Sequence, residues 1–142
     1  MEDNDIKYIV CLQSNNLGKN LITIDLSSNK ISNIDVLCKL NFSNLHYLFL
    51  NGNQIASIEI LVKVKFGELK EPNLSSNKIE SINILRKVNF PQLKEPDISK
   101  NNITDISSLS KAKFNLLEEL LLDKNKITNI DAFAKIICEN LS

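Results

Sequence analysis

One asparagine recurs at a fixed interval through most of this 142-residue chain. Its positions lie 24 residues apart each time: Asn29, Asn53, Asn77, Asn101 and Asn125. A constant period of about 20 to 50 residues is typical of solenoids, in which each repeat is one structural unit stacked on its neighbours. The interval therefore predicts a linear stack whose core is shared between adjacent repeats.

Apolar residues keep a constant spacing around each asparagine, in the pattern L-x-x-L-x-L-x-x-N-x-I. The copy at Leu45, Leu48, Leu50, Asn53 and Ile55 shows it in full. This pattern resembles that of leucine-rich repeat (LRR) proteins and extends over about residues 21 to 137. The resemblance implies an α/β fold: a right-handed, curved solenoid with a parallel sheet on its concave side and short helices or helical turns on its convex side.

The ends of the chain fit the repeat only in part. Shifted by 25 residues, Asn4 and Ile6 fall on Asn29 and Ile31, which indicates half a repeat. We expect an N-terminal half-repeat cap at residues 1–20, five leucine-rich repeats at residues 21–137, and the start of a further repeat or the C-terminal end at residues 138–142. Either residues 132–142 fold over the last strand, or the chain is a fragment of a longer array.

Within each repeat, the segment before the asparagine alternates apolar and polar residues, which predicts five short parallel strands. The asparagine amides are expected to satisfy backbone groups of the turns and to stack as a ladder. A second column is expected to stack in the core: Phe42, Phe66, Phe90 and Phe114. The convex segments open with an N-cap column: Asp35, Glu59, Asn83, Ser107 and Asp131.

Two prolines occupy the inward leucine position of central strands. Pro72 and Pro96 each remove a backbone donor and shorten the side chain that fills the core, so they should weaken the middle of the stack. Both stand in the sequence Lys-Glu-Pro, which fits duplication of one repeat or a pair of Leu→Pro changes.

Charge and cysteine content limit the class of protein. Lys plus Arg and Asp plus Glu both number 17, so no bulk attraction to nucleic acid or anionic membrane is expected. Cys11, Cys38 and Cys138 lack paired spacing, and no apolar run reaches the length of a membrane span. We expect reduced thiols and a cytoplasmic location, with a nuclear one as the alternative.

The sequence contains no constellation that carries chemistry. His46 is the only histidine, and the three glycines form no phosphate-binding or hydrolase motif. The expectation is a protein that is not an enzyme, with no cofactor and no metal site.

The outward strand positions are the ones that the repeat frame leaves free. Tyr47 and Phe49 are the only aromatic residues there, and two adjacent aromatics resemble an interface anchor, although they could simply shield the sheet. The predicted partner-binding residues are Asp25, His46, Tyr47, Phe49, Glu71, Asn73, Glu95, Asp97, Glu119 and Leu121. The surface is mostly acidic and should attract a basic or mixed peptide segment or helix of a protein partner.

Similarity to intracellular LRR proteins of the phosphatase-regulator and acidic nuclear phosphoprotein type implies a scaffold or regulatory subunit that binds other proteins. The long acidic tail of the nuclear phosphoproteins is missing. The alternative is a nucleic-acid-associated protein that uses a lysine-rich convex back: Lys39, Lys63, Lys65, Arg86, Lys87, Lys111 and Lys113. A monomer is expected unless the C-terminal sheet edge pairs.

Overall fold

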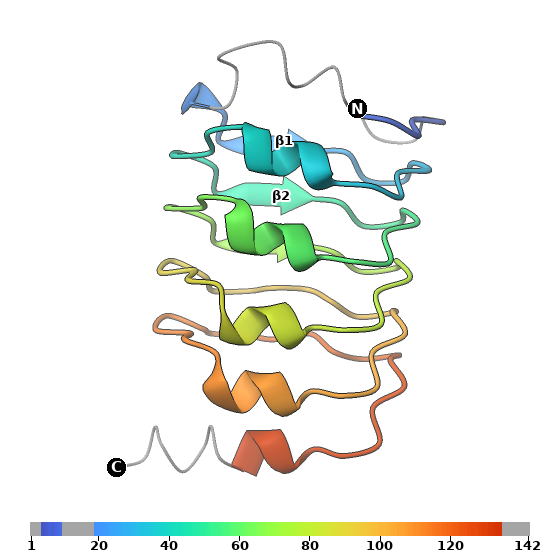
Figure 1. Cartoon of the computed structure of the whole chain (residues 1–142), viewed down its shortest axis with the longest axis vertical. Coiled ribbons are helices and arrows are strands. Elements are labelled where there is room, and N and C mark those ends of the chain that lie inside the picture. Colours follow the sequence, from blue (N-terminus) through green and yellow to red (C-terminus); the bar gives the residue numbers. More distant parts are fainter. Residues whose placement is uncertain (1–3, 10–18, 135–142) are drawn as a thin grey trace.

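The chain winds into a stack of similar turns (Figure 1). The structure is a computed structural model that describes residues 4–9 and 19–134, so parts of the expected half-repeat (1–20) and last repeat, and all of 138–142, lie outside the described residues. Strands (β) and 3-10 helices (η) alternate up to η5, and η6 follows with no regular strand before it: β1 (Thr23–Asp25), η3 (Asp35–Lys39), β2 (Tyr47–Phe49), η4 (Glu59–Lys63), β3 (Glu71–Asn73), η5 (Asn83–Arg86) and η6 (Ser107–Lys111).

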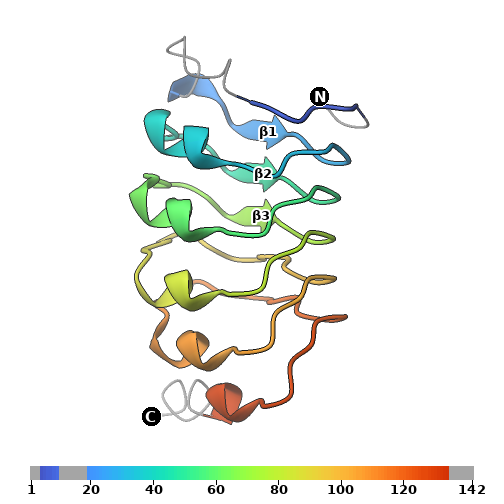
Figure 2. The same ribbon diagram turned by 45° about the vertical axis from the view of Figure 1, so that its right-hand side comes forward.

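The strands form one open parallel sheet in the order β1-β2-β3. Each strand pairs with the strand one full repeat later, so that Thr23 lies beside Tyr47 and Tyr47 beside Glu71. The 3-10 helices lie on the opposite side of the stack (Figure 2). A parallel sheet on one side and helical turns on the other confirm the predicted leucine-rich-repeat solenoid.

The prediction of five regular strands was wrong for the last two repeats. Beyond β3, the sheet continues only as isolated parallel bridges, from Asn73 to Asp97 and from Asp97 to Leu121. The two prolines account for this difference, because each interrupts the hydrogen-bond ladder toward the repeat that follows it.

The bonds around Pro72 show how the ladder is interrupted. The Glu95 amide donates to the Lys70 carbonyl at 3.2 Å, and the Asp97 amide donates to the Pro72 carbonyl at 3.0 Å. The Leu74 amide donates to the Asp97 carbonyl at 2.8 Å. By this alternation, the amide of residue 72 would pair with the Glu95 carbonyl, and proline has no N–H to give. The same bonds surround Pro96, so each proline costs one link and leaves its neighbours intact.

Beneath the prolines, the core contains an apolar cavity of ≈ 40 Å³. Its wall includes Pro72 and Pro96, together with Leu48, Leu74 and Leu93. Proline is shorter than the leucine that the frame places there, so the cavity lies where the leucine side chains would reach. This agrees with the expected loss of core volume at the two prolines.

The phenylalanine column packs beside the leucines. The rings of Phe42 and Phe66 are stacked with centroids 5.7 Å apart, and those of Phe66 and Phe90 are tilted at 6.0 Å. Phe42, Phe66 and Phe90 are buried, whereas Phe114 is half-buried near the end of the stack. The column therefore ties successive repeats together, least completely at the C-terminal end.

The asparagines link each repeat to the one before it. Asn53 donates from Nδ2 to the Leu26 carbonyl at 2.9 Å and to the Leu50 carbonyl at 3.0 Å, and its Oδ1 accepts from the Ile31 amide at 2.9 Å. Asn77, Asn101 and Asn125 repeat this arrangement one step further along. Each side chain thus satisfies backbone groups that would otherwise be buried without partners.

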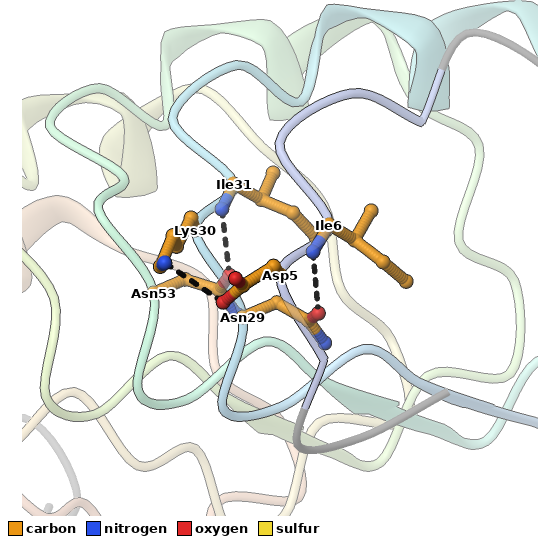
Figure 3. Close-up of polar contacts among 6 residues, drawn as sticks. All are labelled: Asp5, Ile6, Asn29, Lys30, Ile31 and Asn53. Atoms are coloured by element: carbon orange, nitrogen blue, oxygen red, sulfur yellow. Dashed lines mark hydrogen bonds and ion pairs between the residues drawn. The ribbon is translucent and has the colours of Figure 1, made fainter.

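The ladder extends to the N-terminal segment (Figure 3). The Ile6 amide donates to Asn29 Oδ1 at 3.0 Å, as the Ile31 amide does to Asn53. The Lys30 amide donates to the Ile6 carbonyl at 2.9 Å, and the Lys30 ammonium pairs with Asp5 at 2.8 Å. Residues 4–9 therefore lie against the first repeat in the position that a preceding repeat would take.

The residue before each asparagine adopts a left-handed backbone conformation. Gly52 has φ of 67°, and the non-glycine residues at this position are Ser28, Ser76, Lys100 and Lys124. Only Gly52 indicated this conformation from sequence, since glycine is the residue that adopts positive φ most readily. The amides of Ser28, Ser76 and Lys100 each donate to a carbonyl of the next repeat, and these bonds offset the strain of the three turns.

The helical turns begin differently from the prediction. Asp35 and its equivalents are the first helical residues, and no side-chain hydrogen bond comes from the N-cap residues. Instead, the Asp35 amide donates a hydrogen bond to the side chain two residues earlier, Asn33 Oδ1, at 2.7 Å. The equivalent acceptors in later repeats are Ser57, Ser81, Asp105 and Asn129.

Candidate functional site

The candidate site is the outer surface of the sheet, called the sheet face below. It is made of the side chains that alternate with the buried strand residues. One column contains Thr23, Tyr47, Glu71, Glu95 and Glu119, and the next contains Asp25, Phe49, Asn73, Asp97 and Leu121. The structure thus brings nine of the ten predicted site residues onto this face, and His46 lies beside them.

Three rings form a cluster on β2. Tyr47 and Phe49 are half-buried and stacked, with centroids 6.4 Å apart and an angle of 19° between the rings. His46 lies next to Tyr47 at 6.1 Å. Because the rings support one another, they present a fixed apolar surface that loses little conformational freedom on binding.

The second column has a structural task as well. Asp25 Oδ1 accepts hydrogen bonds from the Ser27 amide at 2.9 Å and the Ser27 hydroxyl at 2.5 Å. The hydroxyl, aided by the amide, lowers the pKa of the Asp25 carboxyl. Asn73 binds Ser75 in the same way, and Asp97 accepts from the Ser99 amide. These side chains fix the turn and are only partly free for a partner.

The first column is more available. The carboxylates of Glu71, Glu95 and Glu119 accept no hydrogen bond and form no ion pair within residues 4–9 and 19–134. Glu95 and Glu119 are exposed and Glu71 is half-buried. These residues form an acidic row that continues from Tyr47 toward the C-terminal end of the stack.

Sequence reasoning missed a row of cations along the edge of this face. Lys70 and Lys94 follow His46 at intervals of 24 residues, and both are half-buried. Lys94 forms an ion pair with Glu118, which raises the Lys94 pKa, and the charges of Glu95 and Glu71 add to the effect. The repeat spacing could have revealed this row, because the position lies directly before the first outward column.

The rival surface is the helical side. Lys39, Lys63 and Lys111 end η3, η4 and η6, where positive charge suits the end of a helical turn. All three side chains are exposed. In the part of the chain that the structure describes, no aromatic ring is found stacked among them.

Other kinds of site find little support in the described residues. No group of three or more His, Cys, Asp or Glu side chains within 4–9 and 19–134 could hold a metal ion. Cys38 is a half-buried free thiol, whereas Cys11 and Cys138 lie outside the described residues. None of the described helices has the length and apolar character needed to cross a membrane.

Comparison with known proteins agrees with this architecture. The family described as Leucine Rich repeats (2 copies) matches residues 19–63. An internalin (inlF) from Listeria monocytogenes has a TM-score of 0.78 at 24% identity, over 95% of this chain and 36% of that one. An internalin C2 (inlC2) from the same species has a TM-score of 0.70 at 25% identity, over 94% of this chain and 64% of that one. No curated protein sequence matches.

Proposed function

We propose that this chain, which has the fold of a leucine-rich-repeat solenoid, is a non-catalytic interaction module that binds a protein partner on its sheet face. LRR domains generally mediate protein–protein interaction, and solenoids offer extended surfaces for it. The module would serve as a scaffold or regulatory subunit in the cytoplasm or nucleus.

The stacked pair of Tyr47 and Phe49 carries this proposal. The repeat frame requires no aromatic residue at either position, and the equivalent positions in the other repeats hold polar or charged side chains, apart from Leu121. Aromatic residues supply much of the binding energy where they meet a partner. The acidic row beside them would orient a basic segment and speed its approach.

A second candidate function rests on the exposed lysines of the helical side. They could attract nucleic acid through its phosphates, but base stacking would need aromatic residues among them. Salt-dependent binding to random-sequence DNA or RNA would favour this alternative.

Affinity capture from the source organism tests the proposal. The variant Tyr47→Ala/Phe49→Ala should lose a partner that the wild-type protein retains, because truncating a binding hot spot costs about 2 kcal/mol or more. The variant Lys63→Glu/Lys87→Glu/Lys111→Glu should retain it. The opposite pattern would assign the function to the helical side. If the rings merely shield the sheet, the double alanine variant will be less stable and will still bind.

A further inference from the structure

The acidic row keeps one register through all of its repeats. The amides of Tyr47, Glu71, Glu95 and Glu119 each donate to the carbonyl of the residue 25 positions earlier, at 3.1, 3.2, 3.2 and 3.1 Å. The prolines do not disturb these bonds. Each step along the row is therefore one strand spacing, about 4.8 Å.

This spacing can be compared with the spacing of side chains on a partner segment that lies along the stack, either as an α-helix or as an extended chain. Three steps from Tyr47 to Glu119 span about 14 Å. Three turns of an α-helix span about 16 Å, and long lysine or arginine side chains can absorb the difference. In an extended segment, four alternate residues would face the four positions of the row, and these residues span about 20 Å. A helix matches the row far better.

The charges along the row favour a cationic face on that helix. Glu95 and Glu119 have no ion-pair partner within residues 4–9 and 19–134, and the Lys94 ammonium is already paired with Glu118. At the other end of the row, Tyr47 and Phe49 replace the carboxylates with an apolar surface. The row is thus apolar at one end and anionic over its remaining length.

We propose that the partner segment is an α-helix that lies along the stack, with an apolar side chain on Tyr47 and Phe49 and a lysine or arginine on each following turn. This inference rests on the proposed function and specifies the partner that the same face would take. The helix would place its cations over Glu71, Glu95 and Glu119 in turn.

Stapled peptides provide the test. The probe carries one leucine and three lysines on successive turns of one helical face. One control moves the lysines to the opposite face, and the other replaces the staple with prolines so that the peptide stays extended. The probe should bind at least about tenfold more tightly than either control in fluorescence anisotropy at low salt. Glu95→Gln/Glu119→Gln should weaken binding, whereas the matched variant Glu59→Gln/Glu80→Gln should not.

Equal binding of the helical and extended peptides, or no binding of the probe, would overturn the helix inference. The proposed function would survive either result if Tyr47→Ala/Phe49→Ala still abolished capture of the natural partner. Capture that is insensitive to that double variant would overturn both.

Discussion

Strands β1, β2 and β3 pair over three residues each, whereas in the two later repeats the sheet continues only as isolated bridges at Asp97 and Leu121. The asparagine ladder nevertheless runs through both regions with the same partners. The difference shows that the asparagines join successive repeats in the same way whether or not the sheet pairing is complete. It also explains how the stack accommodates prolines, which remove single sheet bonds.

The largest expected effect comes from breaking the ladder in the well-paired region. Asn53→Ala should destabilise the protein by about 3 kcal/mol, because it leaves several buried backbone groups without partners. Asn125→Ala should cost only about 1 kcal/mol, because Asn125 is half-buried and water can reach its partners. Urea unfolding measures both values. Equal losses of stability would mean that the asparagine bonds contribute equally in the well-paired repeats and in the later ones.

Restoring leucine should make the strand pairing of the two later repeats as regular as that of β1, β2 and β3. Pro72→Leu/Pro96→Leu returns two backbone donors and fills the ≈ 40 Å³ cavity. The gain should be about 2 kcal/mol after allowing for the greater freedom of the unfolded chain. Pro91→Leu, outside the strands, is the control and should change little. An unchanged urea midpoint in the double variant would show that the backbone has adapted to proline.

The smallest effect concerns acid stability at the first turn. Because the Asp25 pKa is lowered in the folded state, this carboxylate stabilises the protein above its ordinary pKa, and the benefit is lost as the pH falls through the lowered value. Asp25→Asn should be nearly neutral at pH 7, since Asn73 makes the same bonds to its serine. The free energy of unfolding of this variant should fall less steeply than that of the wild-type protein as the pH is lowered into the acid range. An identical pH profile would exclude Asp25 from the acid response.

The repeat frame predicted the features that depend on periodicity: the asparagine ladder, the buried columns and the outward rows. It could not predict the left-handed backbone at Ser28 and Lys100, because serine and lysine have no preference for positive φ, whereas the glycine at position 52 adopts it readily. The reduced pairing after β3 depended on whether the N–H that each proline lacks would have pointed to the preceding or to the following repeat. Only the structure shows that it would have pointed to the following one. The ion pair of Lys94 with Glu118 likewise required the positions of both side chains.

The central claim is that a partner contacts the sheet face at Tyr47, and site-specific photo-crosslinking tests it most directly. A photoreactive phenylalanine analogue replaces Tyr47 in one variant and Val62 in the other, since Val62 is 45% exposed on the helical side. We predict a crosslinked partner from position 47 and none from position 62. Adducts formed only from position 62 would contradict the account.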